Sequence, residues 1–199
     1  MNNTFLDAVK HRRSIYDLGK EVTLSQDAIV GIVQQAVQHA PTAFHSQGPR
    51  AVVLFDRQHQ ALWDIVKEAL RKVVPAEGFA ATEEKIDAFA RGYGTVLFFD
   101  DQPTVQNLQK SFPLYSENFP LWATQASGMA QHTVWVALED AGLGASLQHY
   151  NPLIDDEVRK QWNLPEGWKL MSQMPFGSVG SPAGEKDFMP IGERVRVFK

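Results

Sequence analysis

The stretch VKHRRSIYDL, residues 9–18, places one His, two Arg and one Ser in direct succession. Guanidinium groups bind phosphate or carboxylate through two parallel hydrogen bonds, and a hydroxyl beside them adds another donor. Arg12, Arg13 and Ser14 therefore indicate a site for an anionic ligand. A solvated helix end is the alternative, because cations are favoured near helix C-termini. The residue types alone leave both interpretations open.

Two other stretches share this polar or basic character beside an expected strand or helix end: APTAFHSQGPRAVVLF (residues 40–55) and PFGSVGSPAGEKDFMP (residues 175–190). Such segments suit an anion held by charge-assisted hydrogen bonds and short polar side chains. The part GSPAGEK resembles a nucleotide phosphate loop only superficially, because its spacing differs and no Ser or Thr follows Lys186. A nucleotide triphosphatase is therefore not indicated.

Motifs for self-contained catalysis are missing from the sequence. No G-x-G-x-x-G follows an expected strand, no G-x-S-x-G is present, and the six His never pair at the close helical spacing typical of zinc sites. The absence of Cys excludes thiolate nucleophiles and Cys-ligated metals, and fits a reducing compartment. An enzyme with this sequence is expected to take its chemistry from a cofactor.

Length and composition favour one domain over residues 1–199, with 44% hydrophobic residues to form its core. The net charge of −4 argues against a nucleic-acid partner, so the basic cluster is a local device. No window approaches the roughly 20 apolar residues of a membrane span, and the N-terminus has no apolar run before its charges. We expect a soluble cytoplasmic protein without a membrane partner.

Interleaved helical and strand patterns favour an α+β or α/β fold. Strands are expected in the β-branched or apolar runs at 50–55, 95–100, 145–150, 168–179 and 194–198. Helices are expected at 4–12, about 25–40, 57–72, 82–91, 117–141 and 152–162, with a polar, irregular stretch from 101 to about 115. Gly142 or Gly144 is expected to end the longest helix in the left-handed conformation.

The motifs, taken in order, resemble the nitroreductase family of flavoproteins, and specifically its fatty-acid-repression branch. The resemblance runs from residue 5 to the C-terminus and rests on HRRSIY, HSQGPRAVVLF, GYGTVLFFDD, ENFPLWATQASGMAQHTVWVALEDAGLGASLQHYNPLID and EKDFMPIGERVRVF. It implies an α+β fold with a mainly antiparallel sheet sandwiched by helices. It also implies a homodimer joined through the long helix, with non-covalent FMN at the interface and the C-terminal segment reaching across the partner.

The implied activity is NAD(P)H-dependent reduction by a ping-pong cycle, in which NADH or NADPH reduces the flavin and a nitroaromatic or quinone-like acceptor reoxidises it. Arg12 and Ser14 would bind the ribityl and phosphate end of FMN, with Arg13 beside them. The loop His45, Ser46 and Gln47 would lie along the flavin. Many members carry Asn-Ser-Gln there, so His45 departs from the pattern, and an exposed loop histidine is the alternative.

The strand end Gln148, His149 and Tyr150 would offer a backbone amide to flavin N5, which tunes the reduced flavin without acid–base chemistry. Lys186 matches the phosphate-binding Lys of the family. The family's second basic residue two positions later is replaced here by Phe188. The resemblance therefore implies that Arg12, Arg13 and Lys186 neutralise the phosphate between them, and that FMN is held less tightly than usual.

Aromatic side chains before and within the longest helix are mostly explained by core packing. Phe112, Tyr115 and Phe119 lie in the segment expected to be irregular, and are candidates for a lid over the open flavin face. Planar acceptors would stack there. The alternative function is a flavin-binding sensor in lipid or oxidative-stress signalling with little turnover, and a third possibility is a fold that has lost FMN.

Overall fold

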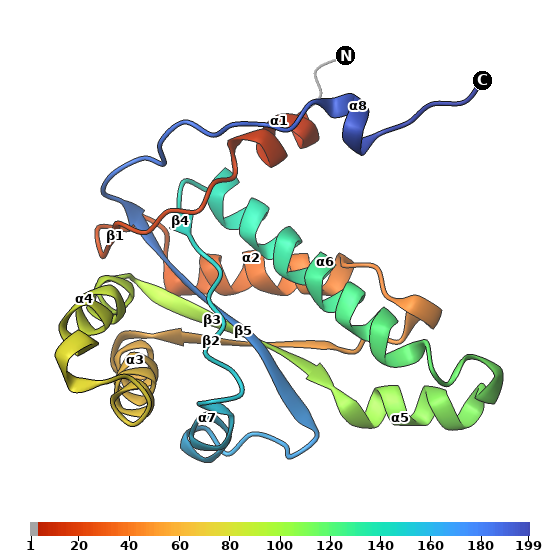
Figure 1. The fold of residues 1–199 in the computed structure, drawn as a ribbon, viewed down its shortest axis with the longest axis horizontal. Coiled ribbons are helices and arrows are strands. Elements are labelled where there is room, and N and C mark those ends of the chain that lie inside the picture. The colour runs from red at the N-terminus through yellow and green to blue at the C-terminus, as the bar shows by residue number, and fades with distance from the viewer. Residues whose placement is uncertain (1–3) are drawn as a thin grey trace.

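A computed structural model describes residues 4–199 and shows one antiparallel sheet covered by helices on both faces (Figure 1). The sheet order is β1-β5-β3-β2, with β4 also pairing with β5. The strands are β1 (Leu18–Gly19), β2 (Pro49–Phe55), β3 (Gly94–Asp101), β4 (Gly144–Ala145) and β5 (Trp168–Val179). The predicted α+β class with a mainly antiparallel sheet is confirmed.

Two groups of helices enclose the sheet: α2 and α6 lie on one face, and α3, α4 and α7 lie on the other (Figure 1). The α-helices are α1 (Thr4–His11), α2 (Gln26–His39), α3 (Asp56–Arg71), α4 (Phe79–Ala90), α5 (Gln102–Ser111), α6 (Phe119–Asp140), α7 (Asp155–Gln161) and α8 (Ile191–Arg194). Three short 3₁₀ helices are η1 (Ala43–His45), η2 (Ala76–Gly78) and η3 (Pro113–Tyr115). Gly142 ends α6 with φ 86°, as predicted.

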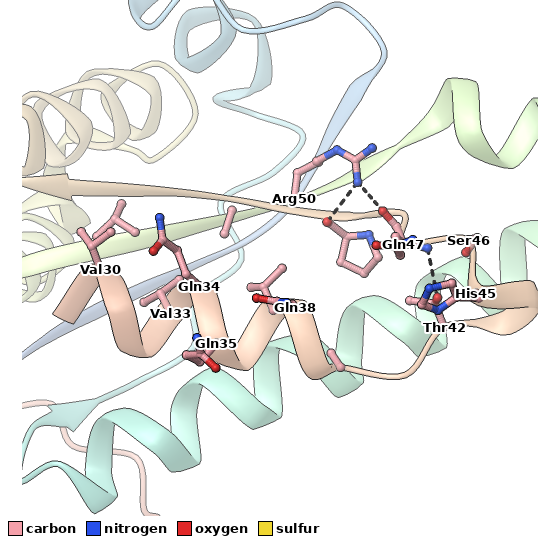
Figure 2. Close-up of a pocket in the computed structure, with 15 residues that line it drawn as sticks. Val30, Val33, Gln34, Gln35, Gln38, Thr42, His45, Ser46, Gln47 and Arg50 are labelled. Carbon is pink, nitrogen blue, oxygen red and sulfur yellow. Dashed lines mark hydrogen bonds between the residues drawn. The ribbon is translucent and has the colours of Figure 1, made fainter. Parts of the chain in front are cut away.

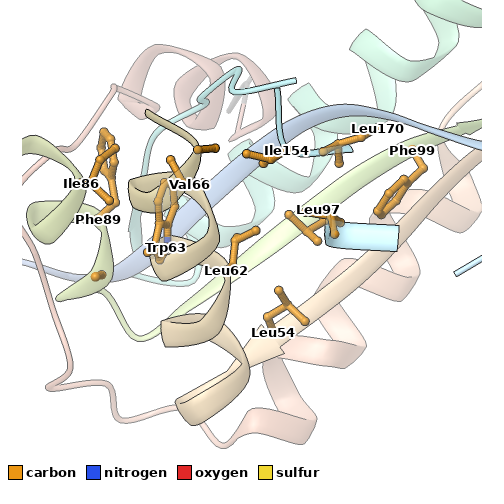
Figure 3. Packing of buried hydrophobic residues seen from close by; sticks show 13 residues of the cluster. Leu54, Leu62, Trp63, Val66, Ile86, Phe89, Leu97, Phe99, Ile154 and Leu170 are labelled. Atoms are coloured by element: carbon orange, nitrogen blue, oxygen red, sulfur yellow. The ribbon is translucent and has the colours of Figure 1, made fainter. Parts of the chain in front are cut away.

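The central strand β3 supplies both halves of the core because successive side chains of a strand point to opposite faces. Leu97 and Phe99 join the cluster with α3, α4 and α7, which Figure 3 shows around Leu62 and Trp63. Val96 and Phe98 join the cluster with α2 and α6. This second cluster therefore fixes the long helix α6 against the sheet, and with it the side chains that α6 carries.

The strand predicted at 145–150 is wrong beyond Ala145. The chain continues beside β5, and Gln148 forms a bridge with Gln173, but the residues between do not form a regular ladder. Pro175 of β5 lies opposite this gap, and its carbonyl accepts from Ser146 N at 3.2 Å. Because proline has no N–H, it cannot return the second hydrogen bond, and the ladder breaks there.

Two other predictions need correction. The terminal strand predicted at 194–198 is absent, since α8 ends at Arg194 and the following residues have no strand beside them; Val197 and Phe198 are exposed. The stretch predicted to be irregular contains α5, which begins with Pro103 in its first turn and buries Val105. Proline is favoured at that position because its missing N–H would be unsatisfied there anyway. The helix predicted at 152–162 begins only at Asp155.

Within residues 4–199, no helix has both the length and the apolar character needed to cross a membrane.

Candidate functional site

The segment after α1 is fixed against β4. Ser14 forms a parallel bridge with Ala145, and Ile15 N donates to Ala145 O at 2.9 Å. The Ile15 side chain is buried and anchors the segment to the protein interior. Two of the predicted site segments, 12–14 and 148–150, therefore lie on the same part of the molecule, on either side of β4.

A buried carboxylate holds the arginines in place. Glu139, near the end of α6, is 6% exposed, and accepts hydrogen bonds from Arg13 N and Trp135 Nε1, both at 2.8 Å. Burial raises the pKa of Glu139. The Arg12 guanidinium lies over the Trp135 ring, 4.4 Å from its centroid. Sequence reasoning missed Glu139 and assigned Trp135 to the core, although their spacing of four residues places both on one face of α6.

Arg12 is attracted to the nearby Glu139 but forms no salt bridge with it in the described part of the chain. Both oxygens of Glu139 are used by neutral N–H donors, and no salt bridge to Arg12 exists within the described part of the chain. A guanidinium stacked on an indole face, with no hydrogen bond to a carboxylate, keeps its donors for an anionic ligand. Ser14 adds a hydroxyl two residues away.

Arg13 differs from Arg12 because its side chain is already engaged. Its guanidinium donates to Gly184 O at 2.6 Å, which draws the segment after β5 toward residue 13. Lys186 lies on that segment, and its ammonium is 5.0 Å from the centroid of the Phe188 ring. Phe188, which stands where the family pattern has a basic residue, therefore contacts Lys186. The structure brings Lys186 to the neighbourhood of Arg13, with the Lys186 side chain exposed.

The three residues predicted to offer a backbone amide differ in whether that amide is available. Gln148 N donates to Gln173 O at 2.7 Å, and Tyr150 N donates to the side-chain oxygen of Gln173 at 2.8 Å. Between them, His149 N has no acceptor among residues 4–199. The Tyr150 ring packs edge-on against Trp63. Its burial raises the pKa of the phenol to about 12, so the phenol stays neutral. Of these three residues, His149 is thus the one whose backbone N–H remains available to a ligand.

The loop after α2 forms a second, separate group. Figure 2 shows it at the end of a cleft of about 950 Å³ between α2 and β2. His45, Ser46 and Gln47 line this cleft. Sequence reasoning missed the polar row that α2 contributes, although the spacing of Gln34 and Gln38 indicates one helix face.

The structure does not join these two groups within one chain. The His45–Gln47 loop follows the C-terminal end of α2, while β4 lies near the other end of that helix (Figure 1). No hydrogen bond connects the loop with residues 12–14 or 148–150 in the described structure. The predicted site residues therefore form two separate groups in the described chain.

The three aromatic residues predicted to form a lid are grouped around Phe44. Phe112 and Tyr115 are about two-fifths exposed, whereas Phe119 is 2% exposed because it begins α6 and packs inward. Phe119 therefore cannot offer a ring face to an acceptor in this conformation.

No group of three or more His, Asp or Glu side chains is placed to hold a metal ion in residues 4–199.

Comparisons with known proteins identify the family and the fold. The model of the nitroreductase family matches residues 9–178. The nitroreductase FRM2 of Saccharomyces cerevisiae is 35% identical over 187 residues, which cover 93% of each chain. The nitroreductase CinD of Lactococcus lactis, solved in complex with chloramphenicol, is 45% identical with a TM-score of 0.91, over 98% of this chain and all of that one. A structure from Desulfovibrio desulfuricans in complex with FMN shares the fold, with a TM-score of 0.71, 19% identity and coverage of 100% and 99%.

Proposed function

This chain belongs to the nitroreductase family, and we propose that it is an FMN-dependent oxidoreductase that uses NADH or NADPH to reduce nitroaromatic or quinone-like acceptors. The single observation that carries the proposal is the Arg12 guanidinium, which is stacked on Trp135 and forms no salt bridge in the described chain. The FMN complex of the related fold from Desulfovibrio desulfuricans supports the choice of ligand.

The available donors fit FMN. Arg12 and Ser14 would bind its phosphate and ribityl end, and Lys186 would add a second cation from the segment that Arg13 tethers. The His149 amide would donate to N5, which favours negative charge on the reduced ring. FMN, when bound, supplies a hydride acceptor and donor in one ring system. The donors are mostly main-chain groups and permanent cations, so none of them has to exchange a proton.

A homodimer would complete the site. In it, Arg12 and Ser14 of one protomer and the His45–Gln47 loop of its partner would face the same FMN, which accounts for their separation within one chain. The strand β2 lies at the edge of the sheet and can accept another strand. The exposed segment RVRVF, residues 194–198, has the alternating pattern of a strand but pairs with no strand among residues 4–199. We propose that it pairs with the partner subunit.

We expect a ping-pong cycle, in which one face of the bound flavin would serve both substrates in turn. The nicotinamide would donate its hydride to N5 and leave before the acceptor enters. Protons for reduction of a nitro group would come from water. CinD was solved with chloramphenicol and with 4-nitrophenol, both of which carry a nitro group on an aromatic ring. These ligands support a planar nitroaromatic as the acceptor class.

The test is an absorbance spectrum of the purified protein supplied with FMN, followed by anaerobic addition of NADH or NADPH. We expect a flavin band near ~450 nm that bleaches and then returns when a nitroaromatic is added. Slow bleaching without rapid return would favour the flavin-binding sensor instead. A protein that takes up no FMN even at excess would contradict the proposal, and Arg12 would then need another anion.

A further inference from the structure

The loop between α2 and β2 adopts a backbone that its residues disfavour. Phe44, His45 and Gln47 have φ angles of 56°, 51° and 51°. In this left-handed region the Cβ atom of any residue but glycine approaches the neighbouring carbonyl, so such residues persist only where their surroundings hold them. Three of them within four positions require definite anchors. These anchors determine how His45 and Gln47 face the cleft.

Hydrogen bonds to side chains and to a neighbouring strand hold the second half of the loop. Gln47 N donates to Thr42 Oγ1 at 3.0 Å. The Arg50 guanidinium donates to the carbonyls of Gln47 and Gly48, and it pairs with Asp101 at 3.0 Å. These contacts fix the chain from residue 47 onward. In the first half, His45 N donates to Thr42 O and Ser46 N donates to Ala43 O, both at 3.1 Å. Because these bonds stay within the loop, the left-handed pair Phe44–His45 needs another contact to tie it to the rest of the protein.

The Phe44 ring supplies that anchor. It packs among four aromatic rings from the α5–α6 region, and one of them, the Trp122 ring, is nearly parallel to it at 20°. The ring centroids lie 4.8 Å from Phe112, 5.3 Å from Phe119 and 6.2 Å from both Tyr115 and Trp122. Aromatic pairs at these separations are attractive beyond the area that they bury. The first half of the loop is thus tied to the segment between α5 and α6.

Core formation does not explain Phe44. Its side chain is 50% exposed, and it lies outside both buried clusters of the sheet. A half-exposed ring on a disfavoured backbone contributes less burial than a core phenylalanine, and the same residue in an ordinary loop conformation would avoid the strain. What the arrangement achieves is a fixed orientation of the next three residues.

We propose that Phe44 is a positioning residue that locks His45–Gln47 in the conformation in which the loop contacts FMN. The inference rests on the proposed function for the identity of the ligand. It goes beyond that function by assigning a role to a residue that contacts the loop and not the cofactor. Because Phe112 and Tyr115 are both exposed and packed on Phe44, the lid segment and the cofactor loop share one anchor.

The test compares Phe44→Ala, which deletes the ring, with Phe44→Tyr, which keeps it. Leu114→Ala is the matched control, since Leu114 lies in η3 between Phe112 and Tyr115 and is 84% exposed. We expect Phe44→Ala to raise the Kd for FMN about tenfold, the factor to which 1.4 kcal/mol corresponds. Phe44→Tyr and Leu114→Ala should stay within about twofold of the parent.

Hydrogen exchange measured by mass spectrometry on apoprotein, over residues 43–49, provides a readout independent of FMN. Phe44→Ala should exchange faster there, with the core strands unchanged. Unchanged exchange would overturn the proposal, and so would a loss of protection spread evenly over the sheet. If Phe44→Ala does not fold, Phe44→Leu serves in its place with the same expectations. Wild-type protein that binds no FMN would overturn the proposed function, while the exchange comparison would still decide the role of Phe44.

Discussion

Acid sensitivity of the fold is expected to depend on one buried histidine, His59. This residue is 2% exposed between α3 and β3, and its ring is fully used as a neutral group. Its Nδ1 lies 2.8 Å from Thr95 Oγ1, and its Nε2 lies 3.2 Å from Ala90 O. Trp63 Nε1 donates to the same threonine oxygen at 3.1 Å, so the threonine hydroxyl proton is directed to Nδ1. A second ring proton would remove the acceptor that this network requires.

Burial lowers the pKa of His59 from 6.5 to about 4 in the folded protein, and repulsion by Lys20 acts in the same direction. Hydrogen bonding to the Ala90 and Phe89 carbonyls and attraction by Asp56 act in the opposite direction but are outweighed. The unfolded chain therefore takes up a proton first as the pH falls. Stability is fully present above pH 6.5 and is lost as the pH falls from 6.5 toward 4. Proton linkage with these two pKa values gives a loss of about 2 kcal/mol between pH 7 and pH 5.

The assay is urea unfolding of the apoprotein at pH 7 and pH 5, at one protein concentration, compared with His59→Gln. The amide of Gln does not titrate, so the variant keeps a polar side chain and loses the proton linkage. Wild type should lose about 2 kcal/mol more than His59→Gln over this interval. The comparison is needed because burial raises the pKa of Asp100, Glu139 and Asp155, which acts in the opposite direction. Equal losses in the two proteins would refute the reasoning.

Three other outcomes follow from the site and the end of α6. Arg12→Ala should raise the Kd for FMN about 10- to 100-fold, because a hydrogen bond to a charged group contributes roughly 1.5–3 kcal/mol. Arg13→Ala should raise the Kd less, since the Arg13 side chain already donates to Gly184 O. Equal losses of affinity in a fluorescence titration would contradict this ranking. Glu139→Ala should weaken FMN binding more than Glu139→Gln, which keeps one acceptor for Trp135 and Arg13; isothermal titration of both variants checks the order. Gly142→Ala should lower the free energy of unfolding by about 1–2 kcal/mol, because a residue with a Cβ atom is strained at a φ of 86°. No neighbouring atom lies within 4 Å of the added methyl, so this strain is the only cost expected. An unchanged urea midpoint would show that the backbone relaxes.

The regular elements that the sequence predicts correctly are those with a strong pattern and a buried partner. Residues 96–99, in the middle of the predicted strand 95–100, are all apolar, and β3 is indeed covered by helices on both faces. In α2, the residues Ile29 and Val33 recur one turn apart and point into the core. In both cases the burial that holds the element is visible as periodicity in the element itself.

The elements predicted wrongly depend on residues elsewhere in the chain or outside it. The ladder after Ala145 breaks because of Pro175, which lies 30 positions later and shows its effect only once the strands are paired. Residues 194–198 have the pattern of a strand, yet a strand requires a neighbour, and the part of the chain that the structure describes places none beside them. A local pattern cannot show either condition.

The predicted site residues form two groups, and the sequence could not rank the members within each. Gln148, His149 and Tyr150 are equivalent in a motif, but Gln173 binds the first and last amides and leaves that of His149. Likewise, Arg12 and Arg13 are adjacent in sequence, but only Arg13 is engaged by the carbonyl of Gly184. Whether an N–H donor remains available to a ligand depends on the groups beside it, and these become known only with the fold.

The charge balance around Arg12 explains how an acidic protein can hold an anion. With a net charge of −4, a carboxylate close to an arginine would be expected to neutralise it. Glu139 is such a carboxylate, and it lies at a helix C-terminus where negative charge is disfavoured. Its two oxygens accept from the Arg13 amide and the Trp135 indole, so it fixes the main chain and the ring on which Arg12 rests. The carboxylate thus orients the cation while its own hydrogen bonds go elsewhere, and the guanidinium stays available to a phosphate.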